Sequence, residues 1–307
     1  MPPELSKMKP LMFVNLISLL LAIGCNEVTQ QAATPSYLDG DWASKAFKDD
    51  WSTSKLVFSF QDTAVCSYLR PYVAFTPYCL KGDTLVIDAA EENYVENATD
   101  RERTFRFLVN RKAENKITLQ PLNLATKKLL YPYKEMGVYD GLELTKMTPV
   151  NNYKFDRIAF YSTFCYGTCP VMYLEIDAQG NLLFHGLHYT GKDGFYKGKL
   201  GKKEIDLINK KLNAIHLDSL EKHYSAGWTD DQTCGMRVQI GHDIFESSAY
   251  GIDEEPVELR FLLQKLMLVY EAAELRSDST VVYQFQFKDF SSLIEPPPAP
   301  APAILNK

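Results

Sequence analysis

Short runs in which apolar and polar residues alternate fill the chain between residues 37 and 148. In one of them, Phe105, Phe107 and Val109 lie on one side of an extended chain and mainly polar residues on the other, as in a half-buried strand. Polar turn residues separate the runs. The predicted strands are 55–60, 63–69, 84–88, 104–109, 116–120 and 138–144. Antiparallel strands at this spacing predict an all-β domain, either a small barrel or a sandwich.

The chain from residue 152 to 275 combines the strand pattern with two helical patterns. Ile205, Ile208 and Leu212 recur at helical spacing within 202–215, with lysines on the opposite side. A second apolar stripe follows Pro256, a residue favoured in the first turn of a helix, and continues to residue 274. The predicted strands here are 155–163, 171–177, 182–189, 236–240 and 244–249. This order predicts an α+β domain in which an antiparallel sheet carries two packed helices.

Turn-forming residues at 148–152 separate the two patterns. We therefore predict a β-rich domain over 37–148, an α+β domain over 152–275, and a segment 276–307 that holds a last strand at 281–287 and a proline-rich tail. The length of 307 residues is enough for about two domains. Hydrophobic residues at 46% and charged residues at 23% are typical of globular proteins. The net charge of the chain is −6, whereas proteins that bind nucleic acids usually carry a basic surface, so the charge does not favour nucleic-acid binding.

The first 25 residues contain the three parts of an export signal. Lys7 and Lys9 form a basic start, 11–23 is an apolar run, and Gly24 places a small residue directly before Cys25. A membrane-spanning helix needs about 20 apolar residues, so this run is too short to remain as an anchor.

This segment resembles a bacterial lipoprotein signal. The resemblance implies that a signal peptide, residues 1–24, is removed, that Cys25 is acylated, and that 25–36 is a polar linker. Acyl chains on Cys25 would attach the protein to a membrane of the cell envelope. An ordinary cleaved signal and a buried hydrophobic helix are the alternatives.

A short motif opens the β-rich domain. Gly40-Asp41-Trp42 resembles the Gly-x-Trp opening of lipocalin-like domains, in which the Trp closes one end of the barrel. This resemblance implies that a small-ligand pocket lies beneath Trp42. The alternative, which we favour, is a barrel filled by its own aromatic side chains and without a ligand.

A cysteine motif lies between the first two predicted strands of the α+β domain. Cys165, Gly167, Cys169 and Pro170 form the pattern Cys-x-Gly-x-Cys-Pro, and a Gly-x-Tyr-x-Gly segment at 194–198 precedes the first helix. Over about residues 154–274 the chain resembles a family of uncharacterised bacterial envelope proteins that carry a domain of unknown function. The resemblance implies a fold and a location in the envelope, and it implies no reaction.

Five cysteines follow Cys25, and an exported compartment permits disulfides. Cys66 and Cys79 lie on neighbouring predicted strands, which makes them natural partners. In an extended strand Cys165 and Cys169 would be about 13 Å apart, so the chain must turn between them if they pair. We predict a Cys165–Cys169 bridge with Cys234 buried and free. Pairing of Cys234 with either of the other two is the alternative.

The remaining question is whether any residue pattern indicates chemistry. The five histidines lack the spacing of metal ligands, and hydrolase and phosphate-loop motifs are absent, so we predict no catalytic residue, metal or cofactor. The sequence favours a non-enzymatic module that binds an envelope protein or a small ligand. The alternative is a thiol-disulfide redox protein that uses Cys165 and Cys169. Redox motifs commonly place Cys-x-x-Cys at a helix N-terminus, whereas this pair is one residue wider and precedes a strand.

Overall fold

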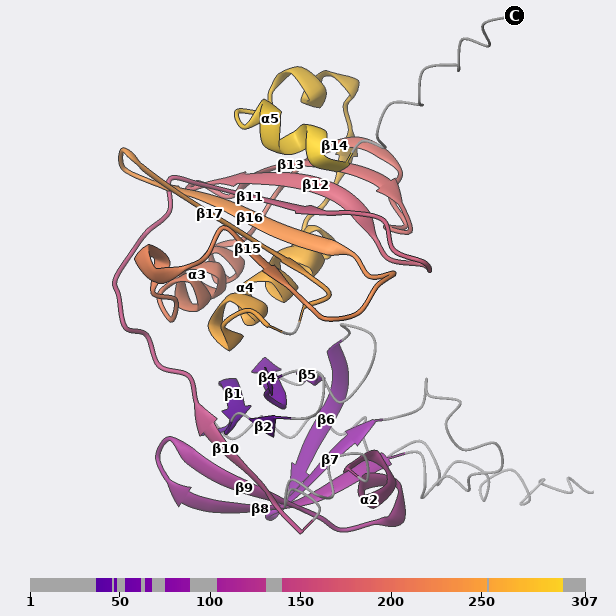
Figure 1. The fold of residues 1–307 in the computed structure, drawn as a ribbon, viewed down its shortest axis with the longest axis vertical. Helices are drawn as coiled ribbons and strands as arrows, with labels where there is room; N and C mark the ends of the chain where they lie inside the picture. Colours follow the sequence, from indigo (N-terminus) through magenta and orange to yellow (C-terminus); the bar gives the residue numbers. More distant parts are fainter. Residues whose placement is uncertain are drawn as a thin grey trace, which may run out of the picture.

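A computed structural model describes residues 37–45, 47–48, 53–61, 64–67, 75–88, 104–130, 140–252 and 254–294. Within them, a β-barrel is followed by a large sheet with helices on both faces (Figure 1). This arrangement confirms the predicted α+β class. The predicted signal peptide, Cys25, the linker and the end of the tail lie outside the described residues.

Eight antiparallel strands form the barrel, which closes because β1 pairs with both β10 and β4. A two-stranded pair, β2 (Phe47–Lys48) and β3 (Thr53–Ser54), lies beside it, and α2 (Leu124–Leu130) packs on β8. The barrel strands are β1 (Gly40–Ser44), β4 (Val57–Gln61), β5 (Ala64–Ser67), β6 (Phe75–Lys81), β7 (Thr84–Asp88), β8 (Thr104–Ala113), β9 (Lys116–Pro121) and β10 (Leu142–Lys146). Of the two architectures predicted, the structure has the barrel.

Several elements of the barrel domain differ from the sequence prediction. Strands β1 and β6, the short pair β2 and β3, and helix α2 were not predicted. Strand β6 contains Pro77, which cannot donate a ladder hydrogen bond and so argues against a strand. Pro77 is tolerated because it faces Ala64, the first residue of β5, and β7 pairs with β6 only from Tyr78 onward. The proline therefore sits where both ladders end.

The second sheet has the strand order β15-β17-β16-β11-β12-β13-β14-β18. Neighbouring strands are antiparallel except β15 and β17, which are parallel, so the sheet is mixed and the prediction of a purely antiparallel sheet was wrong at this edge. The strand bounds are β11 (Arg157–Ser162), β12 (Val171–Asp177), β13 (Asn181–His188), β14 (Gly194–Lys199), β15 (His223–Ser225), β16 (Thr233–Ile240), β17 (Asp243–Tyr250) and β18 (Arg276–Ser277).

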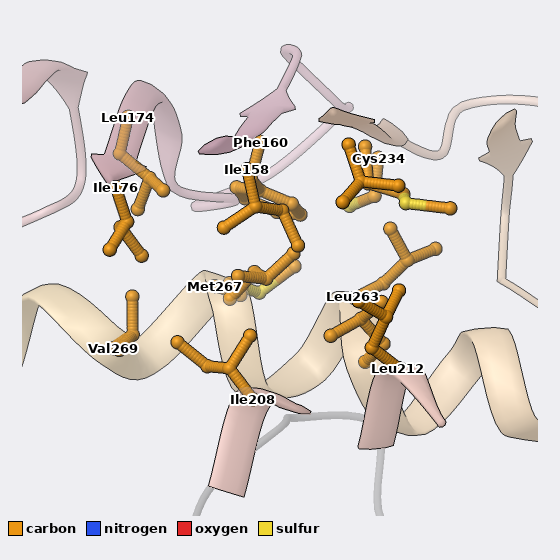
Figure 2. Packing of buried hydrophobic residues seen from close by; sticks show 14 of the residues in the cluster. Ile158, Phe160, Leu174, Ile176, Ile208, Leu212, Cys234, Leu263, Met267 and Val269 are labelled. Atoms are coloured by element: carbon orange, nitrogen blue, oxygen red, sulfur yellow. The ribbon is translucent and has the colours of Figure 1, made fainter. Parts of the chain in front are cut away.

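Two helices cover the sheet face that is turned toward the barrel (Figure 1). They are α3 (Lys202–Leu212) and α4 (Val257–Leu268), with short 3-10 turns η3 (Leu217–Ser219) and η4 (Val269–Ala272) after them. Figure 2 shows Ile208 of α3 and Leu263 of α4 pointing toward sheet residues such as Phe160. Burial of these apolar side chains is the main force that holds the helices on the sheet. The two predicted helices are confirmed.

The opposite face of the sheet is covered by residues 278–294, which we call the C-terminal strap. It consists of η5 (Ser279–Tyr283), α5 (Lys288–Ser291) and η6 (Ser292–Ile294), and it buries Phe285 and Phe290 against Tyr173 and Tyr161. The prediction of a strand at 281–287 was wrong. The backbone N–H groups of residues 286 and 287 donate to the carboxylate of Glu175 rather than to a neighbouring strand.

The barrel and the α+β domain share a small buried interface. Ala43 and Val57 of the barrel pack against Val257 and Phe261 of α4. Helix α4 is therefore buried on nearly all sides, because the sheet covers one face and the barrel covers another. Within the described residues, no helix combines the length and the apolar character needed to cross a membrane.

Candidate binding site at the disulfide end of the sheet

Three loops meet at one end of the second sheet. Loop 163–170 follows β11, loop 189–193 follows β13, and loop 226–232 follows β15. The strand register brings them to the same end, because Ser162 pairs with Cys234 at the start of β16, and Val171 at the start of β12 pairs with His188. We call them the disulfide-end loops.

The first loop is closed by a disulfide. Cys165 and Cys169 lie at disulfide distance, with their Cα atoms 5.8 Å apart, which confirms the predicted pair. At the base of the loop, the Ser162 hydroxyl donates to the Pro170 carbonyl over 2.6 Å. Both cysteines are partly exposed. The loop joins two strands, so no helix N-terminus follows the second cysteine.

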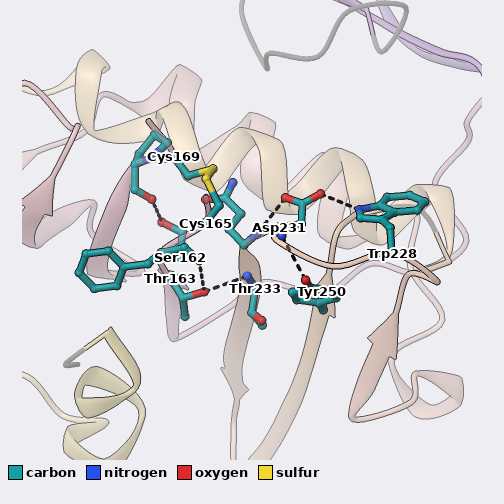
Figure 3. Close-up of a disulfide and its surroundings, with 11 residues drawn as sticks. Ser162, Thr163, Cys165, Cys169, Trp228, Asp231, Thr233 and Tyr250 are labelled. Atoms are coloured by element: carbon teal, nitrogen blue, oxygen red, sulfur yellow. Dashed lines mark hydrogen bonds between the residues drawn. A yellow bond between two sulfur atoms is a disulfide. The ribbon is translucent and has the colours of Figure 1, made fainter. Parts of the chain in front are cut away.

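Hydrogen bonds join this loop to the third loop and to Thr233, the first residue of β16; Figure 3 shows the contact between Thr163 and Thr233. The Tyr166 N–H donates to the Asp230 carbonyl over 3.1 Å. The backbone N–H of Thr233 donates to the Thr163 hydroxyl over 2.9 Å, and the Thr163 N–H donates to the Thr233 carbonyl over 2.9 Å. The disulfide loop and the loop 226–232 are therefore held as one unit.

Asp231 organises the third loop. Its carboxylate accepts the indole N–H of Trp228 over 3.0 Å and the backbone N–H of Gln232 over 2.7 Å. Its own N–H donates to the Tyr250 hydroxyl over 3.1 Å. A Cβ atom at Gly251 would lie 2.9 Å from the Trp228 indole nitrogen, so the indole needs a glycine there. These contacts fix the orientation of an exposed tryptophan.

Two residues in these loops hold a backbone conformation that side chains usually avoid. Tyr189 has a φ of 57° and Asp230 a φ of 71°, and among the described residues no other non-glycine residue has a positive φ. Such a conformation costs free energy unless the surrounding structure enforces it, and it often accompanies function. Both strained residues lie at the same end of the sheet.

Large aromatic side chains are exposed on all three loops. Phe164 is 43%, Tyr166 90%, Tyr189 61% and Trp228 41% exposed. The ring centroids of Phe164 and His188 are 5.3 Å apart and those of His188 and Tyr189 are 6.2 Å apart, with tilted planes, so His188 lies next to both of the other rings. An exposed aromatic cluster of this kind is a common mark of a binding surface.

The other residues of these loops are polar, and their charge is mainly negative. Asp193, Asp230 and Asp231 carry carboxylates, and Lys192 is the single cation within the three loops. The loops contain no Leu, Ile, Val, Met or Arg. The arrangement therefore supplies ring faces and hydrogen-bonding groups, and its negative charge disfavours anionic ligands.

Trp42, the predicted ligand-pocket residue, lies in the packed interior of the barrel. It is wholly buried, and its indole N–H donates to the Leu38 carbonyl over 2.7 Å. Phe58, Phe60 and Phe107 share the same cluster. The described side chains around Trp42 therefore pack against one another, and the ligand pocket beneath Trp42 stays a prediction.

The remaining predicted cysteines have different settings. Cys234 is a buried free thiol within the described chain, and burial raises its pKa, which makes the reactive thiolate scarce at neutral pH. The strand register places Cys66 opposite Phe75, four residues before Cys79 and so about 13 Å from it along the strand. The described strands therefore do not support a Cys66–Cys79 bridge. It stays a prediction, because the side chain of Cys66 lies outside the described residues.

Sequence reasoning found the disulfide but not the aromatic surface around it. Tyr189 and Trp228 belong to stretches of the chain far from Cys165, and only the strand register brings them together. Their signal in the sequence was an aromatic residue within a turn rich in Gly, Thr and Asp. Among the described residues, no group of three or more His, Cys, Asp and Glu side chains is placed to hold a metal ion.

Comparison with known proteins identifies a recurrent unit that includes strands β11 to β17 and the helices α3 and α4. Residues 156–270 match a family model described as "Domain of unknown function (DUF6438)". The match includes all three disulfide-end loops and excludes the barrel and the C-terminal strap. No curated protein and no solved structure matches the chain.

Proposed function

We propose that this protein is a non-enzymatic binding module of the bacterial cell envelope and that the disulfide-end loops are its binding surface. The observation that carries the proposal is the gathering of four exposed aromatic side chains on three loops at one end of the sheet. Exposed aromatic surface is unfavourable in water, and a partner that covers it would gain that free energy. The loops belong to the matched domain, so the surface is part of the recurrent unit.

The setting of the disulfide favours a binding role over the redox alternative. A redox-active pair needs a thiolate stabilised by a helix N-terminus or by a nearby cation. Cys165 and Cys169 lie between two strands, and the charged residues of the neighbouring loop, Asp230 and Asp231, are acidic. Negative charge disfavours a thiolate, whereas a structural bridge is indifferent to it. The bridge more simply stiffens the loop that presents Phe164 and Tyr166.

The surface is tested by comparing exposed tyrosines on and off it. We expect the double variant Tyr166→Ser with Tyr189→Ser to recover at least about tenfold less of its envelope partner, since removing central aromatic contacts commonly costs 2 kcal/mol or more (about 30-fold). The control is Tyr283→Ser, because Tyr283 is 80% exposed on the C-terminal strap. Photo-crosslinking in intact cells followed by quantitative mass spectrometry provides the measurement. Equal recovery by the double variant and the control would exclude these loops as a surface that binds an envelope protein.

The proposed anchor is Cys25, on the basis of the lipoprotein-like signal that precedes it. Two or more acyl chains, each contributing about 0.8 kcal/mol per buried CH₂, would hold the protein on a membrane firmly. We expect the full-length chain, expressed in a bacterium that processes lipoproteins, to sediment with membranes and to begin with an acylated Cys25 by mass spectrometry. The Cys25→Ser variant should remain in the soluble fraction. A wild-type chain that keeps an unmodified Met1 would contradict the anchor and leave the binding surface to be judged separately.

A further inference from the structure

We infer that the ligand of the disulfide-end loops is an uncharged, β-linked sugar chain; this inference rests on the binding surface proposed above. The neighbouring rings of Phe164, His188 and Tyr189 have centroids 5.3 Å and 6.2 Å apart and planes tilted by 54° and 48°, so they offer ring faces turned in different directions along one row. A β-linked hexopyranose with equatorial hydroxyls presents flat C–H faces, which stack on aromatic rings, and its units repeat along the chain. A row of rings suits such a repeating ligand better than a single small molecule.

The composition of the loops distinguishes a sugar from a protein partner. Protein interfaces are enriched in Met and Arg as well as aromatic residues, and their cores are fully desolvated. The three loops contain no Met, Arg or branched aliphatic residue. Their remaining residues are mostly Gly, Thr, Asp, Lys and Gln, which supply hydrogen-bonding groups beside the rings. Aromatic faces flanked by such groups complement a ligand that alternates C–H faces with hydroxyls.

The carboxylates of the loops disfavour a negatively charged ligand. Asp230 accepts a hydrogen bond from the neighbouring Thr229 hydroxyl, and a carboxylate has about four acceptor positions, so it can also accept from sugar hydroxyls. Asp231 is the next residue in the chain, and Asp193 adds a third carboxylate at the same end of the sheet, so polyanionic polymers such as sulfated or phosphorylated chains are repelled. An uncharged sugar chain meets no such repulsion.

The loops are also preorganised. The disulfide, the Tyr166–Asp230 backbone hydrogen bond and the Trp228–Asp231 pair hold the backbone at Tyr166 and the indole of Trp228 before any ligand arrives. Ordering a flexible loop on binding costs conformational entropy for each side chain that becomes immobilised. When a sugar binds, its hydrogen bonds to water are replaced by similar hydrogen bonds to the protein, so each contact gains little free energy. Binding is therefore measurable only if little entropy is lost in ordering the surface, as with rigid loops.

The test is titration of the full chain with chitohexaose, cellohexaose and xylohexaose by calorimetry, and by intrinsic tryptophan fluorescence, to which the exposed Trp228 contributes. We expect saturable binding of at least one of them with a dissociation constant below about 1 mM. The Tyr166→Ala/Tyr189→Ala variant should bind at least tenfold more weakly, and Tyr283→Ala should bind like the wild type. Heparin serves as the polyanion control and should not bind.

Three outcomes would overturn the inference. The first is that none of the three oligosaccharides binds while the wild type still captures an envelope protein through Tyr166 and Tyr189; the sugar ligand is then wrong and the binding module stands. The second is tighter binding of heparin than of the neutral chains. The third is that neither a sugar nor an envelope partner depends on these tyrosines, in which case the inference and the proposed function fail together.

Discussion

Replacing Glu175 by alanine is expected to lower the free energy of unfolding by about 3–5 kcal/mol, the cost of breaking a fully buried charged network. Glu175 is 0% exposed in the middle of β12. Its carboxylate accepts the Phe287 N–H over 2.8 Å, the Gln286 N–H over 3.0 Å and the Tyr173 hydroxyl over 2.7 Å. Removing it would leave the buried Phe287 N–H without its acceptor and the Arg157 guanidinium, 3.2 Å away, without its carboxylate partner, and each such group costs about 1–3 kcal/mol.

The same substitution is expected to release the C-terminal strap, because Glu175 holds two of its consecutive backbone N–H groups. Urea unfolding measures the stability, and hydrogen exchange at Phe287 measures the release. The control is Glu143→Ala: Glu143 is a half-exposed barrel residue that lies 3.9 Å from Lys116, and its loss should change stability by less than about 1 kcal/mol. Equal stability of the Glu175→Ala and Glu143→Ala variants would show that the carboxylate does not hold the strap.

Replacing Lys211 by methionine is the second substitution with a large expected effect, a loss of about 3 kcal/mol in the free energy of unfolding. Lys211 belongs to α3 and is buried, and its ammonium donates to both carboxylate oxygens of Asp41 in the barrel over 2.6 and 2.7 Å. It also lies 5.1 Å from the centre of the Phe261 ring. Methionine keeps the apolar stem but leaves Asp41 with its charge uncompensated at the interface between the domains.

The neighbouring lysine provides a matched control. Lys210 is on the same helix, is largely exposed, and lies 3.9 Å from Asp39, so Lys210→Met should cost at most about 1 kcal/mol. The double variant Lys211→Met with Asp41→Leu should be less destabilised than the sum of its single variants, because the unpaired charge is gone. Thermal unfolding followed in parallel by calorimetry and fluorescence gives these values. Additive effects of the two substitutions would mean that the pair does not couple the domains.

The sequence predicted well those elements whose signal is local. The strand at 84–88 was predicted with the same bounds as β7, and helix α3 begins at the predicted residue 202. The pairing of Cys165 with Cys169 was also predictable, because a bridge between residues so close together depends only on a turn between them. Strand β6 was missed because Pro77 is a local signal against a strand, and only its position opposite the first residue of β5 makes it harmless.

By itself, then, the sequence determined the α+β class, the two helices of the sheet and the disulfide loop, since hydrophobic periodicity and turn residues act over a few neighbouring positions. Tertiary structure alone decided that 281–287 is not a strand, because Glu175, more than a hundred residues earlier, takes the hydrogen bonds that a strand partner would take. It also decided that Lys211 meets Asp41 and that Tyr166, Tyr189 and Trp228 share one end of the sheet. These contacts join residues far apart in sequence, and their partners are chosen by strand register and by packing of whole elements, for which no local pattern exists.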